Sequence, residues 1–267
     1  EQVRIHEDAF KNCTSLKTVR TYDGTRYHFS GISGIHQTEA PDMVRVIQKQ
    51  VLGNFRISGT MLLKYLGEES RVVVPEGITR IAEEAFAGNE AIDRVLLPES
   101  VRTIGAEAFR DCLLLQTIRL PEGLEEIGPG AFENCVKLIR IHLPAQVVRI
   151  EERTFRRCQV LREVCLPEGF QNIGESAFYG CLSLKKVEFP ESLTSIGRMA
   201  FFRCSALQEV HLLAGIKQVG SLAFAESGVR SVWVSGNGRD YGTDLFAGCA
   251  KLKMLVLEEG VEHIPDK

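Results

Sequence analysis

The sequence predicts an α/β solenoid, in which a short coil of chain is repeated and stacked along one axis. Phenylalanines recur every 23 residues from Phe86 to Phe224, and Phe246 follows after 22. Most of these intervals contain a Leu-x-x-Val-x-Leu pattern, whose alternating apolar residues are typical of a strand with one buried face. Most also carry Ala-Phe followed three residues later by Cys. A fixed period of this length indicates stacked repeats.

One copy shows how each segment contributes. The residues LKKVEF at 184–189 alternate as in a short first strand, which Pro190 ends because proline has no N–H for the ladder. The residues SLTSI at 192–196 predict a second short strand, and Gly197 allows a turn after it. The residues AFFRC at 200–204 predict one helical turn, because residues three apart share a helix face. No single copy buries these groups alone, so copies must stack.

These residues resemble the BspA-like, or Treponema-type, leucine-rich-repeat family, whose consensus is close to L-x-x-V-x-L-P-x-x-L-x-x-I-G-x-x-A-F-x-x-C. Residues 71 to 264 follow it almost throughout, and residues 3 to 20 give part of a further copy. The resemblance implies a right-handed leucine-rich-repeat solenoid, rich in strands, with short helical turns on its convex side. It also implies a bacterial protein, secreted or held at the cell surface, that adheres to host proteins or other cells.

We expect three parts, which are a partial leading repeat at 1–20, an interrupting segment at 21–70 and the main array at 71–267. Within the interrupting segment, the sequence predicts a loop through Gln37 and then an amphipathic helix from Pro41 to Leu52. The residues at 55–66 predict a hairpin that turns at Ser58-Gly59. We expect this segment to cap the hydrophobic end of the array.

Composition narrows the class of protein. The net charge of −3 over 267 residues argues against general nucleic-acid binding, which needs a concentrated basic surface. No apolar run is long enough to span a membrane, and no signal peptide begins at Glu1. The chain opens inside a repeat, so we expect a fragment whose export signal lies outside it. Nucleophile-elbow, zinc-protease and phosphate-loop motifs are missing from the sequence, so we expect no enzyme and no cofactor.

Eight cysteines raise the question of disulfides or a metal site. Seven of them occupy one position of the repeat, three residues after Phe, and stacked copies of one position point in parallel. Parallel side chains give poor disulfide geometry, and no C-x-x-C pair is present. We therefore expect free, buried thiols that fill space as small apolar groups. These seven are Cys13, Cys112, Cys135, Cys158, Cys181, Cys204 and Cys249.

Candidate binding residues lie at the outward positions of the first strands, which should line the concave side. We predict a basic half and an aromatic end that bind a ligand there, although the arginines could equally be solvated surface and Trp233 could pack beneath residues 235–241. Charges alternate in sign on adjacent rungs at Glu163, Lys186 and Glu209. This alternation predicts a ladder of surface ion pairs that adds little to the free energy of folding. The candidate residues are Arg71, Arg94, Arg119, Arg140, His142, His211 and Trp233.

The same outward column also contains His142, Cys165, Glu188 and His211. These types could form a thiolate–imidazole pair or a metal site. Four rungs span too far for one ion, however, so we predict no metal.

Two classes of function remain. The first is a non-catalytic, adhesin-like scaffold that binds a protein or glycan ligand, including host extracellular matrix, on its concave face. The second is a structural spacer that displays another domain. A binder should concentrate arginine and aromatic residues on one face, whereas a spacer should not.

Overall fold

The computed structural model describes residues 18–20, 26–28, 53–236, 240–258 and 261. The chain divides into two compact units, Glu1–Asn54 and Phe55–Lys267, and each is described by itself.

The first unit contains a pair of antiparallel strands, β1 (Thr18–Arg20) and β2 (Arg26–His28), with Val19 opposite Tyr27. The loop expected through Gln37 is therefore wrong at β2, where the chain is extended and paired. The helix expected from Pro41 to Leu52 lies outside the described residues.

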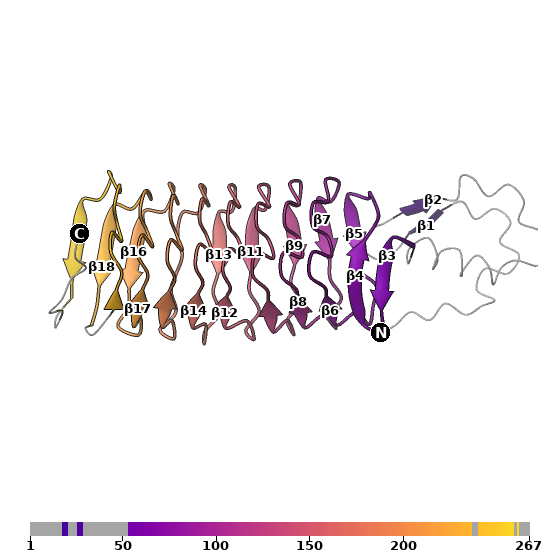
Figure 1. The fold of residues 1–267 in the computed structure, drawn as a ribbon, viewed down its shortest axis with the longest axis horizontal. Coiled ribbons are helices and arrows are strands. Elements are labelled where there is room, and N and C mark those ends of the chain that lie inside the picture. The colour runs from indigo at the N-terminus through magenta and orange to yellow at the C-terminus, as the bar shows by residue number, and fades with distance from the viewer. Residues whose placement is uncertain (1–17, 21–25, 29–52, 237–239, 259–260, 262–267) are drawn as a thin grey trace, which may run out of the picture. The chain divides into compact units, whose positions relative to one another are not determined.

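The second unit is a row of stacked coils, each with a first strand, a second strand and a turn (Figure 1). The first strands are β5 (Arg71–Val73), β7 (Arg94–Leu96), β9 (Thr117–Arg119), β11 (Arg140–His142), β13 (Glu163–Cys165), β16 (Glu209–Leu212), β18 (Ser231–Val234) and β20 (Met254–Leu257). The second strands are β6 (Arg80–Ile81), β8 (Thr103–Ile104), β10 (Glu126–Ile127), β12 (Arg149–Ile150), β14 (Asn172–Ile173), β15 (Ser195–Ile196), β17 (Gln218–Val219) and β19 (Asp240–Tyr241).

Like strands of successive coils pair in parallel, as the predicted stacking requires. The second strands form two sheets in the orders β6-β8-β10 and β12-β14-β15-β17-β19. The first strands form three sheets in the orders β5-β7-β9, β11-β13 and β16-β18-β20. In the coil between β13 and β16, the backbone of Lys186 forms a single isolated, parallel β-bridge with that of Glu163.

A hairpin starts the array. Strands β3 (Phe55–Ser58) and β4 (Met61–Tyr65) form the predicted hairpin, and Gly59 between them has a φ of +58°. Strand β4 then pairs in parallel with β6, and the Tyr65 ring stacks on Phe86 with centroids 5.4 Å apart. The hairpin therefore continues both the second-strand sheet and the aromatic core of the coils.

The turns that carry the Ala-Phe pairs are not helical in the described residues, so the helical part of the predicted α/β class is not confirmed. Glu84 and Gly88 have φ of +51° and +69°, which an α-helix excludes. The N–H of Ala87 donates within its coil to the Glu84 carbonyl, whereas the N–H of Phe86 donates to the next coil. Spacings of three residues suit this pair of β-turns as well as a helical turn.

The phenylalanines of the repeat form one ladder, as the predicted stacking of copies requires. Successive rings stack with centroids 4.7 to 5.5 Å apart, and those from Phe86 to Phe224 are at most 1% exposed. Offset stacking of this kind adds to the free energy of simple burial. The stacked rings are Phe86, Phe109, Phe132, Phe155, Phe178, Phe201, Phe224 and Phe246.

A column of glycines sets how closely the coils approach on the second-strand side. The Gly105 N–H donates to the Ile81 carbonyl of the previous coil at an N–O distance of 2.8 Å. A Cβ at Gly105 would lie 2.6 Å from the backbone nitrogen of Glu83, which is too close for non-bonded atoms. The same backbone contact recurs at Gly128, Gly174, Gly197, Gly220 and Gly242.

The cysteines of the repeat are free thiols, as predicted, in the part of the chain that the structure describes. They do more than fill space, because each is also a hydrogen-bond donor. The Cys112 Sγ lies 3.1 Å from the Phe86 carbonyl oxygen of the previous coil. The same contact, at 3.1 to 3.2 Å, is made by Cys135, Cys158, Cys181, Cys204 and Cys249.

Replacing Phe155 with Ala should lower the free energy of unfolding by about 3–5 kcal/mol, because it leaves a cavity between two stacked rings. Urea denaturation followed by circular dichroism measures this change. Leu182→Ala is the control, because Leu182 is 44% exposed and should change the midpoint little. Equal midpoints for Phe155→Ala and wild type would contradict the packing.

Stability should fall in alkali because of the buried thiols. Burial raises the pKa of Cys112 to about 12, and it also raises the pKa of the Cys135 thiol. Unfolded cysteines release protons above about pH 8.5, so the unfolded state then binds fewer protons than the folded state. Each thiol therefore lowers the free energy of unfolding by about 1.4 kcal/mol per pH unit. For Cys112 this loss of stability runs from about pH 8.5 to 12.

Urea midpoints between pH 7 and pH 10 test this expectation. Cys135→Ala should make the decline with pH shallower by one proton, whatever its effect at neutral pH. A variant that declines as steeply as wild type would show that the thiol does not cause the loss.

Candidate functional site

The outward residues of the first strands form one surface, which we call the first-strand face. Each of the three-residue first strands buries its central residue and turns the flanking residues outward, although Thr117 and Leu96 are half-buried. The outward side chains have no core to fill. This alternation places all seven predicted candidates on the face, as Arg71, Arg94, Arg119, Arg140, His142, His211 and Trp233.

The basic part of the face spans strands β5 to β11. Register places Arg71 beside Arg94, and Leu96 beside Arg119 on the next strand. The Arg119 guanidinium lies 3.5 Å from the Glu99 carboxylate, but both side chains are more than 60% exposed. So exposed an ion pair holds Arg119 only weakly, which leaves its guanidinium able to turn to a ligand.

The middle of the face differs from its prediction. Lys186 pairs with Glu188 two residues along the same chain segment, with Nζ and Oε1 2.6 Å apart. This contact raises the pKa of Lys186 and lowers that of Glu188. The expected ladder through Glu163 and Glu209 is thus wrong at Lys186, because a neighbour at i+2 on the same outward face is within easier reach.

The Cys165 thiol is not activated. Register places His142 beside Cys165, and the Cys165 Sγ lies 3.9 Å from a carboxylate oxygen of Glu163. Partial burial, then the charges of Glu163 and Glu188, raise the pKa of the Cys165 thiol, which disfavours the thiolate that a nucleophile requires. Within the described residues, no group of three or more His, Cys, Asp or Glu side chains could hold a metal ion.

An aromatic pair occupies the other end of the face. His211 on β16 and Trp233 on β18 are register partners, and their rings stack with centroids 4.3 Å apart and planes 6° apart. Trp233 is half-buried, with Val256 beside it on β20, and Met254 on that strand is 43% exposed. The stack holds a large, partly apolar surface in one orientation.

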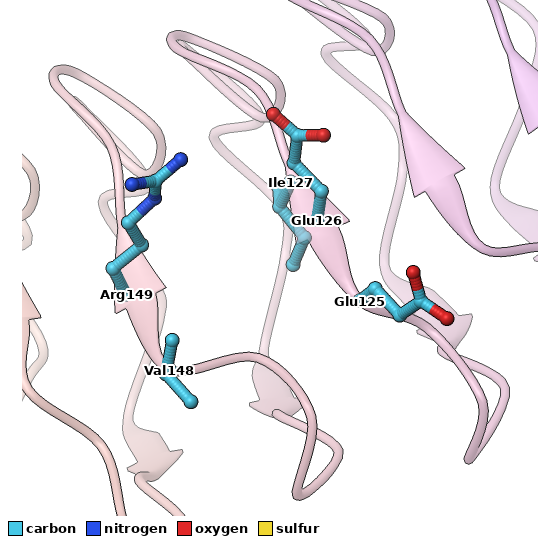
Figure 2. Close-up of a pocket in the computed structure, with 5 residues that line it drawn as sticks. All are labelled: Glu125, Glu126, Ile127, Val148 and Arg149. Atoms are coloured by element: carbon cyan, nitrogen blue, oxygen red, sulfur yellow. The ribbon is translucent and has the colours of Figure 1, made fainter.

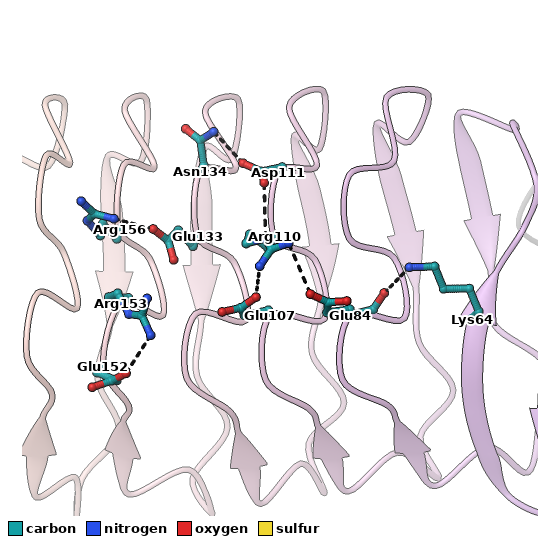
Figure 3. A network of polar contacts seen from close by, with 10 residues as sticks. All are labelled: Lys64, Glu84, Glu107, Arg110, Asp111, Glu133, Asn134, Glu152, Arg153 and Arg156. Atoms are coloured by element: carbon teal, nitrogen blue, oxygen red, sulfur yellow. Dashed lines mark hydrogen bonds and ion pairs between the residues drawn. The ribbon is translucent and has the colours of Figure 1, made fainter.

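A polar network on the turn side of the coils was not predicted from the sequence (Figure 3). Arg110 contacts carboxylates in its own coil and, at 3.3 Å, Glu84 of the previous coil. Arg156 reaches Glu133 of the previous coil at 2.7 Å and lies over the Tyr179 ring of the next. The signal was available, because the residue after each Phe forms a column of its own.

A pocket of about 240 Å³ opens between β10 and β12 on the second-strand side, and it was not predicted (Figure 2). Charged Glu126 and Arg149 stand on neighbouring coils at its rim, above the apolar Ile127. Glu125 and Val148 complete the lining. The sequence did carry a signal here, since Glu151 stands where neighbouring copies have glycine.

The chain belongs to the BspA-type leucine-rich-repeat family. The family model for six copies of the BspA type leucine rich repeat region matches residues 1–56, 59–183 and 171–267. No curated protein matches the chain. Within the described residues, no helix has the length and apolar character needed to cross a bilayer.

Solved structures show the same architecture. A leucine-rich-repeat protein of Treponema pallidum is 31% identical, with a TM-score of 0.61, and the match covers 75% of this chain and 89% of that one. A leucine-rich repeat protein of Bacteroides ovatus ATCC 8483 is 21% identical, with a TM-score of 0.51, over 76% and 69% of the two chains. The first match supports the family, and the second supports the fold.

Replacing His211 with Ala should uncover one face of the Trp233 ring. Because Trp233 is the sole tryptophan, its fluorescence should shift to longer wavelength and be quenched more strongly by acrylamide. His142→Ala, on the same face but far along the array, should leave the emission unchanged. An unaltered spectrum for His211→Ala would show that the stack does not cover Trp233 in solution.

Proposed function

We propose that this chain is a non-catalytic recognition scaffold, an adhesin-like module that binds a protein or glycan on its first-strand face. Host extracellular matrix is the partner class that the family resemblance favours, and it sets the module at the cell surface or in secreted form. The stack of His211 on Trp233 carries this proposal, because a half-buried tryptophan outside the core is typical of an interface anchor.

Charge on the face supports the same proposal. Arg71, Arg94 and Arg140 are exposed on successive or nearby rungs, and none is part of the core. Guanidinium groups form paired hydrogen bonds with carboxylates and sulfates, so an acidic protein segment or a sulfated glycan fits this end. The aromatic end would then add the apolar contact that fixes the ligand's position.

A structural spacer remains the second candidate function. It is favoured by the middle of the face, where Lys186 pairs with Glu188 as solvated surface residues commonly do. In a spacer, the coils would only set the distance between other domains, and no outward residue would matter for binding.

Trp233→Ala and Arg119→Ala should each weaken binding to a true partner by about 2 kcal/mol, roughly thirtyfold in Kd, without altering the fold. Wild type and both variants are to be compared on an array of matrix proteins and glycans. The part of the affinity that depends on Arg119 should also fall as salt is added.

Arg80→Ala is the matched control, because Arg80 is an exposed arginine on the second-strand side. It should bind as wild type does. If wild type binds nothing, or if Trp233→Ala and Arg119→Ala bind as tightly as wild type, the first-strand face is not the site and the spacer function is favoured.

A further inference from the structure

One junction between coils lacks the backbone hydrogen bonds of the others. Across a regular junction on the second-strand side, Gln171 donates to the Val148 carbonyl at 2.7 Å and Gly174 donates to Ile150 at 2.8 Å. Equivalent bonds join every second strand from β4 to β10 and from β12 to β19. Between β10 and β12, which are fully described, no such bond forms and the two sheets end.

The glycine column is interrupted at this junction. The residue that would donate across this junction is Glu151, whereas each coil from the next one to β19 has glycine at that position. A Cβ at Gly174 would lie 2.6 Å from the carbonyl carbon of Glu151, so a regular junction between two such coils has no room for a side chain. Ala82 holds this position in the first coil, where it donates to Leu62 of the hairpin strand β4 and not to another coil. Glu151 has a side chain. A Cβ at this position would meet the same crowding against the backbone of the β10 coil, and the pocket beside Ile127 lies at this junction.

The turn side of the same junction stays closed. Gly130 donates to the Glu152 carbonyl at 2.9 Å and Phe132 donates to Thr154 at 2.9 Å, while Arg156 reaches Glu133. The first-strand side is sparsely bonded here, because β9 and β11 do not pair and a single bond from Ile139 to Gln116 joins them. The two coils are thus regularly bonded along one of three sides, and a single further bond joins them on the first-strand side.

We propose that the Cβ of Glu151 acts as a steric wedge, which holds two coils apart on the second-strand side and makes the junction between β10 and β12 a hinge. The turn side forms the hinge axis, and the pocket is the open side. The coils on either side remain stiff, because their second strands are bonded at each junction. Bending at this point changes the separation between Arg119 and Arg140, which lie on opposite sides of the hinge.

Charge offers a different explanation for the opening, and two substitutions separate the explanations. Glu151 pairs with Arg149 at 2.6 Å, and Glu125 and Glu126 lie across the junction. Glu151→Ala removes the carboxylate but keeps the Cβ, so the junction should stay open. Glu151→Gly removes both, so the junction should close and the missing hydrogen bonds should form.

Amide hydrogen exchange measured by NMR tests the wedge. In wild type and in Glu151→Ala, the amides of Val148, Arg149 and residue 151 should exchange at least about tenfold faster than those of Gln171 and Gly174. In Glu151→Gly they should slow by at least about tenfold. Glu152→Gly is the control for the added flexibility of glycine, and it should not slow them.

Two results would overturn the wedge. One is wild-type amides at Val148 and Arg149 that are as protected as that of Gln171. The other is equal protection in Glu151→Ala and Glu151→Gly, which would assign the opening to charge.

Distance measurements test the hinge itself. Spin labels at Arg80→Cys and Gln218→Cys, in a Cys165→Ser background, lie on exposed second-strand positions on either side of the junction. The distance distribution should be broad in wild type and in Glu151→Ala, and narrower in Glu151→Gly. Equal widths in all three proteins would show that the open junction does not bend.

Discussion

Backbone hydrogen bonding between successive coils is the interaction on which the rest of this structure depends. On the second-strand side it requires the close approach that Gly105 and Gly174 permit. On the turn side it requires alternate N–H groups to point along the array, which the positive φ of Glu84 and Gly88 provides. The aromatic ladder follows from this spacing, because coils held about 5 Å apart bring rings of one column to stacking distance. The backbone therefore sets the spacing of the coils, and the side chains pack at that spacing.

Much of the fold could be predicted because the repeat pattern appears many times. Each copy repeats the same evidence for Phe155 as a core residue, and its burial follows directly. The turns could not be predicted in the same way. A positive φ at Glu84 or Arg153 has no residue type as its signal, since both are ordinary side chains in a strained region. Only the alternation of N–H directions, which depends on neighbouring coils, distinguishes these turns from a helical turn.

The candidate surface could be predicted as positions but not as contacts. Alternation along each strand places Arg119 and Trp233 outward, and register then brings Trp233 onto His211. The partner of a long side chain depends on rotamers that the repeat does not constrain, so the pairing of Lys186 with Glu188 does not follow from the repeat. The pocket, in contrast, has a signal in the sequence. One departure from the consensus, at Glu151, falls at the junction where the pocket opens.

The column of buried thiols bears on how this protein would withstand oxidants. Disulfide formation needs a thiolate with access to another sulfur. Burial raises the pKa of the Cys135 and Cys158 thiols, and their S–H groups donate to backbone carbonyls. Oxidation of such a thiol must therefore wait until its coil opens. The chain can carry a cysteine in most coils through an oxidising environment without cross-linking one coil to another. Cysteine oxidation would then occur in coils that have locally unfolded, and its position would not follow the number of cysteines in a region.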